Sequence, residues 1–207
     1  MLKGSGPFSG PFDPAGKGVP TRILGVDPGM VSTGFGLIEI VNNGSILYRE
    51  CGVIRPRGLS IPKRLQKIFR GLVQLIETFS PQYMAVERPF FGKNVKSAMT
   101  LGQARGAALL AAAETGLEVQ EFSPLEVKQA VSGYGRATKE QIQSMVRVLL
   151  RVPRELTADP ADALAVALCL AHCLPLKNSL PGGDWRTLGR GKRRLTRRRA
   201  RELGNSP

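Results

Sequence analysis

The chain has 207 residues, enough for one domain with a hydrophobic core and a tail at each end. It contains no run of eighteen apolar residues and no apolar N-terminal stretch, so we expect neither a transmembrane helix nor a signal peptide, and no membrane association. Its three cysteines lack disulfide or zinc spacing, which favours a cytoplasmic location, and a formal net charge of +14 favours an anionic partner.

The two ends differ in composition from the middle of the chain. Residues 1–21 are rich in Gly and Pro and predict a flexible leader. Residues 177–207 hold ten Lys and Arg against two acids, and this net charge of +8 predicts a basic disordered tail that binds nucleic acid. An anionic membrane surface and a merely solubilising tail are the alternatives. One folded domain is expected at residues 22–176.

Apolar patterning predicts an α/β domain. TRILGVD predicts a strand that ends at Asp27, and GFGLIEIV and SILYRECGVI, joined by NNG, predict an antiparallel hairpin. Helical spacing predicts a helix over 61–79, and QYMAVE predicts a strand that ends at Glu87. A helix over about 95–115, a strand LEVQEF and helices near 124–131 and 139–150 follow. This order predicts a sheet with helices on both faces.

The segment LTADPADALAVALCLAH, residues 156–172, predicts a last helix that is apolar on every face over 163–171 and is therefore buried. Asp159 suits the N-cap, Pro160 the first helical position and Asp162 the first turn, so helix capping alone explains both acids. A buried helix with two carboxylates at its start also needs cations or donors nearby. From this stretch alone both interpretations stay open.

Four acids fall near the carboxyl ends of the predicted strands, where binding and catalytic residues collect in sheets of this kind. Asp27 and Glu87 end buried strands, and Asp159 and Asp162 begin the last helix. Separately, Asp27 suits an Asp-Pro-Gly turn and Glu87 could pair with Arg88. Together, four close carboxylates need a cation, and hard oxygen ligands suit Mg²⁺ or Mn²⁺. Two such ions hydrolyse phosphodiesters, so an acidic pit in a basic surface indicates a metal-dependent nuclease.

Four segments, in order and at matching spacing, resemble the RuvC family of bacterial Holliday-junction resolvases, the crossover junction endodeoxyribonucleases. They are ILGVDPGMVSTGFGLIE, MAVERPFFGKNVKSAMTLGQARGAALLAA, VKQAVSGYGRATKEQIQSMVRVLL and ADPADALAVAL, within about residues 22–173. The resemblance implies a ribonuclease H-like fold with a mixed five-stranded sheet. It also implies an enzyme for recombination and repair that resolves four-way DNA junctions by paired symmetric nicks, leaving 5′-phosphate and 3′-hydroxyl ends.

The resemblance also implies the parts of the site. The family's metal-binding catalytic acids fall on Asp27, Glu87, Asp159 and Asp162, with two Mg²⁺ or Mn²⁺ ions per active site and Asp27 bridging both. Its two catalytic lysines near the scissile strand fall on Lys128 and Lys139, for which ordinary solvated lysines are the alternative. The residues expected to bind DNA are Phe90, which would stack at the junction, Lys93, Lys128, Arg136 and Lys139.

The family's partners are a second copy of the chain and the RuvA–RuvB branch-migration complex. SAMTLGQARGAALLAA is rich in Gly and Ala, which agrees with the family's dimer interface, although a core contact would read the same. The chain departs from the family pattern in its leader, its arginine-rich tail and the Arg88–Pro89 pair before Phe90. Cys169, the neighbouring His172 and Cys173 are interpreted as structural.

Three other functions are weighed. An ATPase of the actin and sugar-kinase type would need a second lobe, for which the chain is too short. A non-catalytic junction-binding protein would gain by losing the four acids. A ribonuclease H that cuts RNA–DNA hybrids stays open, and a cleavage assay would separate it from a resolvase.

Overall fold

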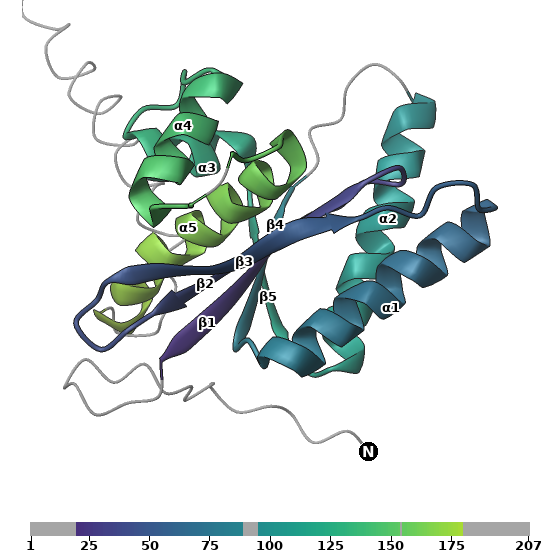
Figure 1. Cartoon of the computed structure of the whole chain (residues 1–207), viewed down its shortest axis with the longest axis horizontal. Helices are drawn as coiled ribbons and strands as arrows, with labels where there is room; N and C mark the ends of the chain where they lie inside the picture. Colours follow the sequence, from purple (N-terminus) through teal and green to yellow (C-terminus); the bar gives the residue numbers. More distant parts are fainter. Residues whose placement is uncertain (1–19, 89–94, 154, 180–207) are drawn as a thin grey trace, which may run out of the picture. The chain divides into compact units, whose positions relative to one another are not determined.

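The computed structural model describes residues 20–88, 95–153 and 155–179, with side chains described as far as residue 174 in the last range (Figure 1). Phe90 and Lys93 lie outside the described residues, as do nearly all of the predicted leader and tail. Residues 1–171 form one unit and residues 172–207 a second. The first unit contains every element except the end of the last helix. No helix among the described residues has the length and apolarity to cross a membrane.

The chain alternates strands and helices largely as the apolar patterning predicts. In chain order the elements are β1 (Thr21–Asp27), β2 (Thr33–Ile40), β3 (Ile46–Ile54), α1 (Ile61–Phe79), β4 (Tyr83–Glu87), α2 (Val95–Glu114), β5 (Glu118–Phe122), α3 (Pro124–Ser132), α4 (Lys139–Leu150) and α5 (Ala158–Ser179). β1 therefore starts one residue inside the segment predicted as the leader, and α5 runs three residues into the segment predicted as the tail.

The five strands form one mixed sheet in the order β3-β2-β1-β4-β5. β1, β2 and β3 pair antiparallel, whereas β4 pairs parallel with both β1 and β5. The hairpin between β2 and β3 closes at Gly44, whose φ of 79° lies in the left-handed region that favours glycine. The predicted five-stranded mixed sheet is confirmed.

The register brings several strand ends to one end of the sheet. Asp27 pairs with Gly34, Gly34 pairs with Val53, and Glu87 pairs with Phe122. Because β1, β4 and β5 are parallel, the last residue of each lies at this same end, which we call the carboxyl end of the sheet. Ligand-binding residues of open α/β sheets collect at such an end.

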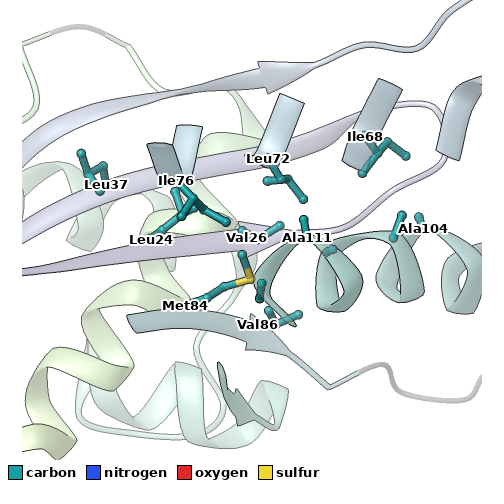
Figure 2. Close-up of a cluster of buried hydrophobic side chains, with 13 residues drawn as sticks. Leu24, Val26, Leu37, Ile68, Leu72, Ile76, Met84, Val86, Ala104 and Ala111 are labelled. Atoms are coloured by element: carbon teal, nitrogen blue, oxygen red, sulfur yellow. The ribbon is translucent and has the colours of Figure 1, made fainter. Parts of the chain in front are cut away.

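One face of the sheet packs against α1 and α2. Figure 2 shows Leu24, Val26 and Val86 from the strands beside Leu72 of α1 and Ala111 of α2, all of them buried. Side chains alternate between the two faces along a strand, so Asp27 and Glu87 belong to the opposite face.

That opposite face packs against α5 (Figure 1). A Cβ atom on Gly25 of β1 would lie 1.9 Å from the carbonyl oxygen of Ala163, and one on Gly34 of β2 would lie 2.2 Å from that of Asp159. Glycine at both positions therefore lets the backbone of α5 lie directly on the strands. Residues 163–171 are all buried, which confirms the predicted burial of this helix.

The predicted N-cap of α5 is wrong. The helix already includes Ala158, and the amide of Ala161 donates to the carbonyl oxygen of Thr157 at 3.2 Å, so Asp159 lies within the first turn. Thr157 supplies the first helical acceptor in place of Asp159. The side chain of Asp159 is thereby available to interactions outside its own helix.

Candidate active site

The fold brings the four predicted acids together from three elements. Asp27 ends β1 and Glu87 ends β4, the parallel strand beside it, with Val26 and Val86 paired one residue earlier. Asp159 and Asp162 lie in the first turn of α5 and one residue beyond it, and the close approach at Gly34 places Asp159 against the start of β2. A sheet end and a buried helix thus carry one acidic cluster.

The charges in this cluster act on one another. Burial, followed by the charges of Asp162, Glu87 and Asp159, raises the pKa of Asp27 to about 7, and Lys139 opposes the rise. Burial and the charge of Asp162 also raise the pKa of Glu87, against the opposing charges of Lys139 and Lys128. The carboxylates therefore outweigh the cations around them, and added positive charge would stabilise their ionised forms.

Lys139 is the cation that contacts the cluster directly. Its Nζ lies 2.7 Å from Oδ2 of Asp162, and this hydrogen bond and charge raise the lysine's pKa, with further contributions from Asp27 and Asp159. Lys139 is the first residue of α4, whose N-terminus is fixed by a capping box between Thr138 and Gln141. The local sequence TKEQ thus holds the lysine at the acids.

Lys128 approaches the cluster from α3. Its charge lowers the pKa of Glu87 as the smallest of the contributions to that group, which places the lysine near the cluster rather than in contact with it. Arg136, in the segment between α3 and α4, is exposed. The structure therefore places Lys139 in contact with the acids and Lys128 near them, while Arg136 is an exposed residue of the segment between α3 and α4.

Ser32 is a site residue that the sequence interpretation missed. Its Oγ donates a hydrogen bond to Oδ2 of Asp159 from the loop between β1 and β2. The next residue steadies this loop, because Thr33 Oγ1 donates to the carbonyl oxygen of Gly29 at 2.9 Å. A Ser-Thr pair two residues after a Pro-Gly turn is the sequence signal for such a loop. Its contact with the last helix depends on the fold.

Arg88 and Glu126 form a second missed contact. Arg88 does not neutralise Glu87, because its Nη2 lies 2.8 Å from Oε2 of Glu126, and its amide donates to the carbonyl oxygen of Phe122 at 2.7 Å. Glu126 also accepts from the amide of Ser123 at 2.6 Å in the capping box of α3. This contact links the end of β4, which carries Glu87, to the helix that carries Lys128.

The donor set suits a divalent cation in its chemistry but not in its present side-chain positions. Four carboxylates supply hard oxygen ligands and more negative charge than nearby cations offset, as Mg²⁺ and Mn²⁺ require. Yet no three His, Cys, Asp or Glu side chains within the described ranges are arranged to hold one ion together. Lys139 holds Asp162, so ion binding there requires this acid to exchange partners, whereas Ser32 engages only Oδ2 of Asp159.

Comparison with known sequences identifies similar proteins. A family model described as crossover junction endodeoxyribonuclease RuvC matches residues 23–170. A relative with that name from Pelotomaculum thermopropionicum is 51% identical over 153 residues, which make up 72% of this chain and 92% of the relative. Another, from Heliobacterium modesticaldum, is 52% identical over 155 residues, or 73% of this chain and 94% of the relative.

Solved structures show the same likeness. Thermus thermophilus RuvC in complex with a Holliday junction substrate matches with a TM-score of 0.71 and 31% sequence identity, over 75% of this chain and 96% of that one. The yeast mitochondrial Holliday junction resolvase Ydc2 matches with a TM-score of 0.52 and 13% identity, over 73% of this chain and 79% of that one. The second match extends the shared fold to a distant sequence.

Proposed function

We propose a function for this protein from its family: the chain belongs to the RuvC family of crossover junction endodeoxyribonucleases. The protein is an endonuclease that resolves four-way DNA junctions in recombination and repair. The observation that supports this activity in the chain itself is the convergence of Asp27, Glu87, Asp159 and Asp162 at one end of the sheet, with their charges coupled. Such a cluster on a chain of net charge +14 suits hydrolysis of a polyanion.

The four acids are proposed to hold two Mg²⁺ or Mn²⁺ ions, which supply an activated water and neutralise charge on the phosphate. Asp27 and Glu87 are half-buried, so fewer water molecules compete for their oxygens than at a fully exposed carboxylate. Ser32 orients one oxygen of Asp159. The proposed products are a 5′-phosphate and a 3′-hydroxyl end.

Lys139 is proposed to bind the scissile phosphate after its ion pair with Asp162 has broken. Nζ of Lys139 is already at the acids, and its raised pKa keeps it charged at neutral pH. A charged donor held beside the scissile phosphate stabilises the negative charge that develops there. Lys128 is proposed to act on the same strand from α3. Phe90, Lys93 and Arg136 are proposed to contact the DNA around the junction.

A homodimer is proposed through the outer face of α2. Val95, Met99 and Leu110 on this helix are 71%, 64% and 58% exposed, and a Cβ on Gly102 or Gly106 would meet nothing within 4 Å in the single chain. These residues recur every three or four positions, so they form one apolar stripe with room for a second backbone. Two active sites related by a two-fold axis would cut a two-fold junction symmetrically.

The location and the partner are proposed from the family as well. Because the bacterial relatives act on DNA, the proposed location is the cytoplasm. The proposed partner that delivers the junction is the RuvA–RuvB branch-migration complex.

Cleavage of a mobile four-way junction tests the proposed function. The protein is incubated with the junction, linear duplex or an RNA–DNA hybrid, in Mg²⁺, in Mn²⁺ and in EDTA. Paired symmetric nicks on the junction alone, absent in EDTA, are expected. Cutting of the hybrid would instead indicate a ribonuclease H, and tight junction binding without cutting in either metal would indicate a binding protein.

A further inference from the structure

A group of cations on α1 and the segment before it has no part in the active site described above. Arg55 and Arg57 follow β3, and Lys63, Lys67 and Arg70 lie on α1; all five are exposed. The sequence contains no acid between Glu50 and Glu77. Across the described ranges of the chain, none of the five forms an ion pair. Their positive charge is therefore directed to solvent.

Three of these cations line a groove of about 510 Å³ between α1 and the end of β3, here called the α1 groove. Lys63, Lys67 and Arg70 lie along its helical side, together with Gln66 and Gln74. Positions 63, 67, 70 and 74 follow the three-and-four spacing of a single helix face. The groove thus presents a row of hydrogen-bond donors along the helix axis.

The floor of the α1 groove is apolar and tightly packed. A Cβ on Gly71 would lie 2.9 Å from Cδ1 of Ile54, so glycine lets α1 approach the end of β3 closely at this point. Arg64 Nε donates to the carbonyl oxygen of Leu59 at 2.7 Å, which fixes the segment that leads into the helix. The cations are therefore carried on a rigid support.

The α1 groove starts at the same end of the sheet as the acids. Val53 pairs with Gly34, and Gly34 pairs with Asp27, so the chain leaves β3 level with the active site. α1 packs on the face of the sheet opposite α5 (Figure 1). A long polyanion that crosses the carboxyl end of the sheet can contact both the acids' side and the α1 groove.

We propose that the α1 groove binds the phosphate backbone of a duplex DNA arm beyond the scissile phosphate. The choice of DNA rests on the proposed function; the groove's preference for phosphates rests on its charge. Lys63 to Arg70 span about 10 Å along the helix axis, which matches about three phosphate steps of 3.4 Å along one DNA strand. Regularly spaced cations that contact backbone phosphates add affinity without sequence preference.

The salt dependence of binding tests this proposal. The double variant Lys67→Gln/Arg70→Gln removes two charges from the α1 groove. Arg147→Gln/Arg151→Gln is the matched control, because it also removes two exposed charges. Arg147 lies in the last turn of α4, and Arg151 follows the helix beside the start of β3, at the other end of the sheet. Binding of each full-length variant to a four-way junction is measured in EDTA by fluorescence anisotropy over a series of salt concentrations, with thermal melting to check folding.

The slope of log K against log salt is negative, and the groove variant is expected to reduce its magnitude by about 1.8, since each phosphate contact contributes about 0.9. The control is expected to leave that slope within about 0.3 of the unsubstituted protein. Equal slopes for both variants would overturn the assignment of the groove. If the slope becomes less steep for the groove variant but the unsubstituted protein cuts no junction in either metal, the groove binds DNA and the proposed enzymatic function fails instead.

Discussion

Lys139 of α4 forms an ion pair of 2.7 Å with Asp162 of α5, so a proposed phosphate ligand and a proposed metal ligand are bound to each other. Burial and the neighbouring carboxylates raise the pKa of Asp27 to about 7, and the charge of Lys139 offsets part of this rise. A divalent cation would supply that positive charge in place of the lysine and release Lys139 toward the substrate. The ion pair therefore links metal loading to the availability of the lysine.

Asp162→Asn is expected to reduce junction cleavage at least about 100-fold, because it removes a proposed metal ligand and an interaction with a catalytic metal is worth several kcal/mol. Junction binding in EDTA is expected to stay within about threefold, since no basic contact to DNA is lost. Glu140→Gln, which changes an exposed acid in the first turn of α4, serves as the control. Cleavage by Asp162→Asn at more than a tenth of the unsubstituted rate would exclude Asp162 as a ligand.

Lys139→Met is expected to slow cleavage of bound junction about 100-fold, as for the removal of one charge-stabilising donor from an active site. Lys139→Arg keeps the charge and is expected to recover part of that loss. Single-turnover cleavage at saturating protein separates this effect from binding. Equal rates for the Met and Arg variants would show that the positive charge at residue 139 does not serve the reaction.

Gly34→Ala is expected to impair the active site without altering any charged residue. The new Cβ would lie 2.2 Å from the carbonyl oxygen of Asp159, so the start of α5 must move away from β2. We expect the free energy of unfolding to fall by about 3 kcal/mol, together with a loss of cleavage in the fraction that stays folded. Urea unfolding and cleavage at a temperature well below the transition measure both effects, and full activity with unchanged stability would contradict the packing of α5 on Gly34.

Arg88→Gln and Glu126→Gln are expected to have a small effect on stability, about 1 kcal/mol or less, because both side chains are substantially exposed. A larger effect is expected on cleavage, about threefold to tenfold, since the pair links Glu87 on β4 to the helix of Lys128. The double variant should be no slower than the slower single variant. Additive losses would show that the two residues act separately.

Acid is expected to destabilise the fold through Glu39. This buried carboxylate contacts Arg49 and, at 2.9 Å, Arg22; the hydrogen bond from Arg49 is the largest cause that lowers its pKa from 4.5. Because the folded-state pKa lies below the unfolded value, the contacts of ionised Glu39 with the two arginines stabilise the fold above about pH 4.5. That stability is lost as the pH falls through the folded-state pKa. Thermal melting from pH 7 to pH 3 should show a smaller decrease for Glu39→Gln than for the unsubstituted protein.

Apart from the end of α5, which runs seven residues beyond the predicted segment, the sequence predicts the bounds of the strands and helices to within a residue or two, because their apolar periodicities are strong, as in residues 61–79. It also places Asp27 and Glu87 at strand ends, and the register then brings them together. The partners of Arg88 and Asp159 are not predictable in the same way. Glu126 and Ser32 lie 38 and 127 residues away from them in the chain, and only the packing of helices on the sheet brings each pair into contact.

The buried helix α5 has a consequence for how the site moves. Asp159 and Asp162 begin a helix whose residues 163–171 are all buried, with one side against glycines of β1 and β2. Amide hydrogens in that stretch can exchange with solvent only when the core itself opens, so their protection should approach that of global unfolding. The backbone that carries two of the four acids is thus expected to be as resistant to local unfolding as the core. Changes of shape during the reaction must come from side-chain rotations and from elements outside α5.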